Sequence, residues 1–112
     1  MAETAITVQT LAAAGTSTTF AAANADGNFF SSAGNPRQRY KNTNGSPRVV
    51  TVVAQRACEL GTLHDIEITV PATTGDVEVP PVDKRFFADE TGLIHVTYDA
   101  VTGLTVAVTR DA

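Results

Sequence analysis

The chain is built from short runs in which apolar and polar residues alternate, and turn-forming residues separate one run from the next. Ile66, Ile68 and Val70, for example, alternate with Glu67 and Thr69. A period of two places one set of side chains on each face of a β-strand, whereas a helix needs apolar residues three and four positions apart. The pattern therefore predicts an all-β protein without an amphipathic helix.

The composition supports the same conclusion. Of the 112 residues, 34 are the β-branched Thr, Val and Ile, whereas only 5 are Leu and none is Trp. β-Branched side chains lose rotamers in a helix but pack well on a pleated sheet. The alternating runs predict about eight short strands, at residues 5–10, 18–22, 37–42, 48–55, 65–70, 76–79, 93–98 and 104–110.

Turn signals recur roughly every 8–12 residues between these runs, as in β-sandwiches. No linker, repeat or low-complexity block divides the sequence. We therefore predict one domain over residues 1–112, an antiparallel β-sandwich of jelly-roll or immunoglobulin-like topology, with residues 1–4 as a flexible N-terminal arm.

Four segments have residue patterns that predict more specific features. Asn44-Gly45 favours the positive φ of a tight turn, so residues 42–45 are predicted to form a hairpin. The strand at 48–55 is apolar on both faces, which indicates a central strand buried on both sides. Residues 28–36 are predicted as an ordered loop that buries one aromatic, and residues 84–87 as a short edge strand or an extended loop.

Charge and cysteine content exclude several classes of protein. The formal net charge is −4 and no basic block is present, so binding to nucleic acid is not expected. No apolar run approaches the roughly 18 residues of a membrane-spanning helix, and the N-terminus lacks the basic and apolar regions of a signal peptide. The single cysteine, Cys58, cannot form an internal disulfide and is expected to be a small buried apolar residue.

Few residues could carry chemistry. His64 and His95 are the only histidines, and both are expected at the surface without a catalytic partner. The carboxylates of the predicted strands, such as Asp65 and Glu67, are expected to be solvated charges rather than a glycosidase pair. The loop around Asp26 lacks the Gly and Glu positions of an EF-hand calcium site. The sequence therefore predicts neither an enzyme nor a bound metal or cofactor.

Several segments match a known group of proteins over most of the chain. They are AITVQTLAAAGT at 5–16, YKNTNG at 40–45 followed by VVTVV, CELG at 58–61, HDIEITVPA at 64–72, the run from Pro80-Pro81 to RFF at 85–87, VTY at 96–98 and LTV at 104–106. Together they resemble small proteins encoded in the head-gene regions of tailed bacteriophages and prophages. Those proteins are identified as minor capsid, decoration or cement proteins.

The resemblance implies a structural virion protein without a catalytic motif. Its partner would be the major capsid protein. The resemblance also implies self-association as a trimer. The chain would be synthesised in the host bacterial cytoplasm and would then dock on the capsid exterior. A protein that binds only the assembled shell stabilises that shell by mass action.

The resemblance and the residue types together suggest where the contact surface lies. Aromatic and arginine side chains are enriched at the centres of protein interfaces. For the same side chains the alternative is core packing by an aromatic and solvated arginines. The predicted interface residues, from the N-terminal segment and from residues 29–39, are Glu3, Thr4, Phe29, Phe30, Arg37 and Arg39.

Two other functions stay open. One is a head-fibre or tail-associated domain that binds a receptor or a glycan, although the chain has no Trp and only Tyr40 and Tyr98 as tyrosines. The other is a small enzyme or a metal-binding sandwich, for which His64, His95 and scattered carboxylates are the only support.

Overall fold

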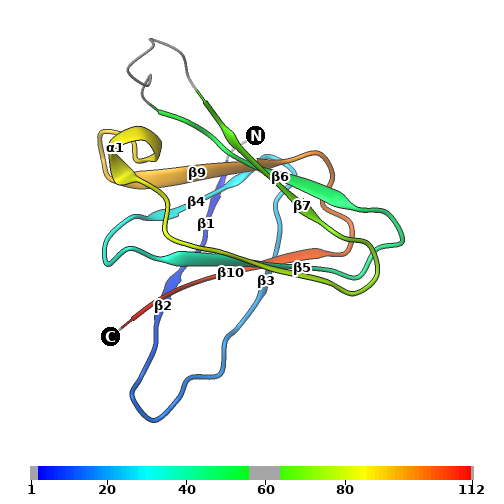
Figure 1. The fold of residues 1–112 in the computed structure, drawn as a ribbon, viewed down its shortest axis with the longest axis horizontal. Helices are drawn as coiled ribbons and strands as arrows, with labels where there is room; N and C mark the ends of the chain where they lie inside the picture. Colours follow the sequence, from blue (N-terminus) through cyan, green and yellow to red (C-terminus); the bar gives the residue numbers. More distant parts are fainter. Residues whose placement is uncertain (1–2, 56–63, 112) are drawn as a thin grey trace.

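The computed structural model describes residues 3–55 and 64–111, which form two stacked β-sheets (Figure 1). The first sheet contains, in spatial order, β1 (Thr4–Ala5), β4 (Asn28–Ser31), β9 (Leu93–Tyr98), β6 (Arg48–Val52) and β7 (Ile66–Val70). The second contains β2 (Val8–Thr10), β10 (Leu104–Arg110), β5 (Arg37–Asn42) and β8 (Gly75–Val79), and β3 (Ala21–Ala22) also pairs with β10. A one-turn helix, α1 (Lys84–Phe87), lies beside β9. No described helix is long and apolar enough to cross a membrane.

The core lies between the sheets and consists of the inward side chains of the alternating runs. Tyr40, Phe30, Ile94 and Leu104 are its largest fully buried members. Polar groups in the core are paired, because burial without a hydrogen bond is costly. The Tyr98 hydroxyl, for instance, donates to the Asn28 side chain over 2.6 Å, and burial raises the pKa of Tyr98.

The predicted all-β sandwich is confirmed, but its sheets are mixed rather than purely antiparallel. β1 runs parallel to β4, and β2 runs parallel to β10. Both parallel pairs arise because the run predicted as one strand at 5–10 is divided between the two sheets. The chain crosses at Ile6, whose side chain is 8% exposed and fills the space between them. This division and the additional strand β4 account for ten described strands instead of about eight.

The predicted hairpin at residues 42–45 is wrong. β5 and β6 flank this segment but belong to different sheets, and Gly45 does not have a positive φ. The connection is instead organised by Asn42, which is 1% exposed and whose amide nitrogen donates to the Ser46 carbonyl over 2.9 Å. The Asn-Gly pair therefore lies in a link between sheets.

Three further segments differ from the prediction. The expected loop at 28–36 begins with β4, which pairs with β9 and does bury one aromatic, Phe30. β6 is flanked by β7 and β9 as expected of a central strand, but only Val50 and Val52 on its inner face are buried. Residues 84–87 form α1, because the Asp83 side chain accepts the Arg85 backbone N–H over 2.9 Å and caps the turn. The prediction for Cys58 lies outside the described residues.

The two edges of the sandwich are built differently. At one edge the chain itself passes from β1 to β2 and joins the sheets. At the other edge β7 and β8 are the last strands of their sheets and are linked through the turn at residues 71–74 (Figure 1). Each of them therefore has one edge without a paired strand among the described residues.

Candidate functional site

The predicted interface residues do not form one surface. Phe30 points into the core and is 2% exposed, so the core-packing alternative holds for this side chain. Its neighbour Phe29 points to the outer face of the first sheet and is half-buried. Arg37 and Arg39 lie on β5 of the second sheet, on the opposite outer face. Sequence proximity within residues 29–39 therefore does not bring these groups together.

Both arginines are paired with carboxylates on the second sheet. Arg37 contacts Asp111 at 2.6 Å. Arg39 donates two hydrogen bonds to the carboxylate of Asp76, at 2.9 and 2.8 Å, and so lowers the pKa of that carboxyl. The guanidinium of Arg39 also lies 5.7 Å from the centre of the Phe20 ring. These cations are arranged as surface ion pairs, which contribute little to stability.

Glu3 and Thr4 are held against the first sheet and do not form a free arm. The Thr4 backbone N–H donates to the Gly27 carbonyl over 3.2 Å, and the Asn28 side-chain amide donates to the Thr4 carbonyl over 2.9 Å. The Glu3 carboxylate lies against the His95 ring, with its two oxygens 3.0 and 3.1 Å from Nδ1. From Glu3 onwards, the N-terminal segment is part of the fold.

His95 lies between two carboxylates on the outer face of the first sheet. Opposite Glu3, the other ring nitrogen, Nε2, is 2.6 Å from Oδ2 of Asp89. Partial burial lowers the pKa of His95, but the hydrogen bonds that the ring donates to Asp89 and Glu3, together with the charges of these carboxylates, outweigh this effect and leave the pKa above its ordinary value. The same contact is the largest cause of a strongly lowered pKa at Asp89, which also accepts the Leu93 backbone N–H.

Both nitrogens of His95 are therefore engaged, and neither is free to act as a general base. Among the described residues, no group of three or more His, Cys, Asp or Glu side chains could hold a metal ion. We interpret the His95 cluster, defined as Glu3, Asp89 and His95, as a clamp on the N-terminal segment. Asp89 is only six positions from His95, but nothing in the sequence pointed to a contact with Glu3, 92 positions away.

The apolar groove, a feature that the residue pattern did not predict, lies between β7 and β8. It has a volume of about 500 Å³. Ile66, Ile68 and Val77 face inward on these strands but stay half-buried, because none of the described strands lies beyond β7 or β8 to cover them. The apolar side chains that line the groove are Ile66, Ile68, Val77, Val79, Pro80, Pro81, Val82 and Phe87. An apolar side chain of another molecule could pack against these residues.

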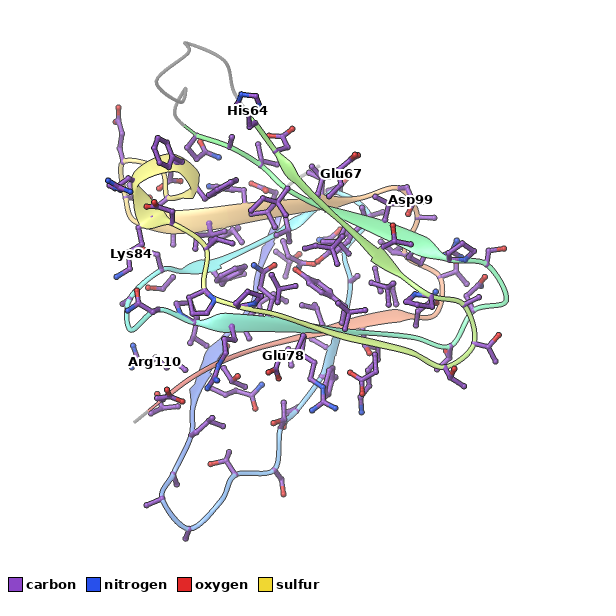
Figure 2. The ribbon with its side chains drawn as sticks, in the orientation of Figure 1. His64, Glu67, Glu78, Lys84, Asp99 and Arg110 are labelled. Carbon is purple, nitrogen blue, oxygen red and sulfur yellow. The ribbon has the colours of Figure 1, made fainter. Side chains whose placement is uncertain are left out.

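Two acidic residues, Glu78 and Asp83, are part of the lining of the apolar groove. Glu67 on β7 and Glu78 on β8 are exposed, and both are labelled in Figure 2. Of the five carboxylates in residues 65–83, Asp76 pairs with Arg39 and Asp83 pairs with Arg85. A separate hollow of about 550 Å³ beside Gln55 and residues 88–91 has no comparable apolar lining. The apolar groove with its acidic rim is therefore the strongest candidate interface.

Comparison of the chain with protein-family models, with curated proteins and with solved structures found no match in any of the three.

Proposed function

We propose that this chain is a structural virion protein that docks on the outer surface of a phage capsid and stabilises the shell. The observation that carries this proposal is the apolar groove, because a half-buried apolar floor with a polar rim is the usual anatomy of a protein interface. The sequence resemblance to phage decoration and minor capsid proteins supports the major capsid protein as the partner.

A docking role agrees with the contacts that the polar side chains make within the chain. Arg37 and Arg39 pair with carboxylates on the second sheet, and His95 clamps the N-terminal segment on the first. Ile66, Ile68 and Val77 stay half-buried, and nothing within residues 3–55 and 64–111 covers them completely. Contact with an assembled shell would remove this apolar area from water, at roughly 25 cal/mol per Å². Many copies on one shell would add these modest contributions.

The first test is the composition of the virion. Particles purified from a lysate of the phage that encodes the chain are expected to contain the polypeptide by mass spectrometry, with matching density on the capsid exterior in cryo-electron microscopy. Absence of the polypeptide from pure particles would overturn the proposal. Density on the tail or on a fibre instead of the shell would also contradict it, and would favour a receptor-binding role.

The second test measures binding to expanded shells that lack the protein. Ile68→Ser removes a half-buried aliphatic side chain from the apolar groove and is expected to weaken binding by about tenfold. Leu11→Ser makes the same kind of change beyond β2, at the opposite edge of the second sheet, and is expected to bind like the wild type. Equal binding by both variants would show that the groove is not the contact surface.

A further inference from the structure

The hydrogen-bond pattern of β6 shows which way its backbone groups point. The Val53 N–H donates to the His95 carbonyl over 3.0 Å, and the Asp99 N–H donates to the Val49 carbonyl over 3.1 Å. Residues of an antiparallel strand alternate between its two neighbours in their hydrogen bonding. The odd-numbered residues of β6 therefore bond to β9, and the even-numbered residues bond to β7.

The same alternation identifies the unpaired backbone groups of β7. The register partners of the even-numbered β6 residues are Ile66, Ile68 and Val70, which direct their N–H and C=O groups towards β6. Glu67 and Thr69 lie between them and direct theirs to the free edge of the sheet. Such an edge is a template on which another extended chain can form hydrogen bonds.

A strand added at this edge would meet two different environments. Residues directly opposite Glu67 and Thr69 would place their side chains on the same outer face of the sheet as Glu67 and Thr69. They would therefore lie next to the carboxylate of Glu67. The residues between them would point inward, over Ile66, Ile68 and Val77 in the apolar groove. The site therefore calls for a segment in which apolar residues alternate with basic residues.

Charge distinguishes between the alternative occupants of this edge. A second copy of the chain would bring its own β7, which carries Glu67 and no basic residue to pair with it. Two such strands would place both Glu67 carboxylates on one face without a compensating charge. Lys or Arg on a different protein would be attracted instead. Pro80 and Pro81 follow directly after β8 and lack the N–H that a ladder needs, so β7 is the more receptive edge.

We propose that β7 accepts an extended segment of a partner protein by strand addition, with apolar side chains in the groove and Lys or Arg beside Glu67. The inference deepens the proposed function and rests on it only for the identity of the partner as a capsid protein. Hydrogen bonds to the edge supply affinity, and the alternation of apolar and basic side chains supplies selectivity.

The probe for this proposal is a short synthetic peptide in which Val alternates with Lys, blocked at both ends. Added to the isotopically labelled full-length chain, it is expected to shift the amide resonances of Glu67 and Thr69, more strongly at low salt than at high salt. A counterpart peptide with Glu in place of Lys is expected to bind at least about tenfold more weakly. Equal binding of the two peptides, or shifts confined to other strands, would overturn the proposal.

Thr69→Pro is the matched variant, because it removes an N–H that points to the free edge without breaking a bond within the sheet. It is expected to weaken peptide binding by at least about tenfold, while Thr69→Ser, which keeps the N–H, binds like the wild type. A circular dichroism melt of each variant verifies the fold, and Glu67→Pro, at the other free-edge position, replaces Thr69→Pro if the latter unfolds. Unchanged peptide binding by a folded proline variant would contradict strand addition.

Shell binding separates this inference from the proposed function. If wild-type protein binds expanded shells and folded Thr69→Pro binds equally well, the virion role stands and strand addition at β7 is wrong. If wild-type protein binds the peptide but no shell, strand addition stands and the virion role is wrong. Sedimentation of the wild-type chain alone is expected to show a monomer, and a dimer abolished by Thr69→Pro would assign the edge to a second copy and overturn the choice of partner.

Discussion

At the scale of single residues, His95 lies between two carboxylates, so the contacts that it makes depend on its protonation. Only the protonated ring has an N–H on each nitrogen and can donate to Glu3 and Asp89 together. The folded-state pKa of His95 is raised, so its stabilising effect is complete below the unfolded value of about 6.5 and is lost as pH rises through the folded value. The pKa of Asp89 is lowered, so its effect is complete above about pH 3.9 and is lost on further acidification.

The clamp is therefore strongest in mildly acidic solution. We expect the melting temperature of the wild type to fall by a few degrees between about pH 6 and about pH 9, and His95→Gln to lack this part of the pH dependence. His64→Gln changes the exposed histidine and is the control, which is expected to keep the wild-type dependence of melting temperature on pH. Thermal melts across this pH range test the prediction, which fails if His95→Gln follows the wild-type curve.

Gly75 is a second residue whose identity is dictated by its surroundings. A Cβ at this position would lie 2.0 Å from the carbonyl oxygen of Pro71, which is backbone and cannot move aside easily. Gly75→Ala is expected to destabilise the protein by about 1–3 kcal/mol in urea denaturation. Gly45→Ala, where a Cβ meets nothing within 4 Å, is expected to change stability by less than about 0.5 kcal/mol. Similar losses for both variants would contradict this explanation.

At the scale of the elements, Asn42 links two connections between the sheets. Its amide nitrogen lies at the end of β5 and donates to Ser46 on the way to β6, at 2.9 Å. The same nitrogen is 3.3 Å from the carbonyl of Val70 and 3.2 Å from that of Pro71, where β7 leads into β8. One buried side chain thus holds two corners of the sandwich, each of which takes the chain from one sheet to the other.

Removal of this amide leaves carbonyl groups unpaired in a buried place. Asn42→Ala is expected to cost about 1–3 kcal/mol of unfolding free energy and to increase hydrogen exchange in β7 and β8. Asn44→Ala is the control, because its side chain accepts only the exposed Ser46 N–H, which water can replace. Equal effects of the two substitutions on unfolding free energy would show that the buried amide has no special role.

At the scale of the whole molecule, both ends of the chain are needed to complete the sheets. β10, the last strand, lies between β5 on one side and β2 and β3 on the other. β1, near the beginning, pairs with β4 at the edge of the other sheet. Such pairing between distant parts of the sequence makes the fold cooperative and its formation slow compared with helical proteins.

A chain that ends at Gly103 therefore lacks the strand that connects β2 to β5. We expect it to show no cooperative unfolding transition by circular dichroism. A chain that ends at Arg110 keeps all of β10 and loses the ion pair between Arg37 and Asp111, whose aspartate side chain is 81% exposed. It should melt close to the full-length protein, since exposed pairs contribute little. A cooperative transition in the shorter chain would contradict this account.

The residue pattern alone was enough to predict the class of fold and the inward face of most strands. The predicted strands at 37–42, 93–98 and 104–110 coincide with β5, β9 and β10, because the alternation of side chains between two faces is a local property of each run. The β-branched composition acts at the same local level. Neither property depends on which strands become neighbours. Both could therefore be used for prediction before the pairing of the strands was known.

The pairing of the strands, and the candidate sites that depend on it, became known from the three-dimensional fold. It divided the run at 5–10 between the sheets, separated β5 from β6 despite the Asn-Gly signal between them, and placed Glu3 against His95. It also made β7 and β8 the final strands of their sheets, which leaves Ile66 and Ile68 half-buried beside a free edge. The physical reason is that pairing depends on contacts between residues far apart in the chain, and a local alternation of polar and apolar residues fits many such partners equally well.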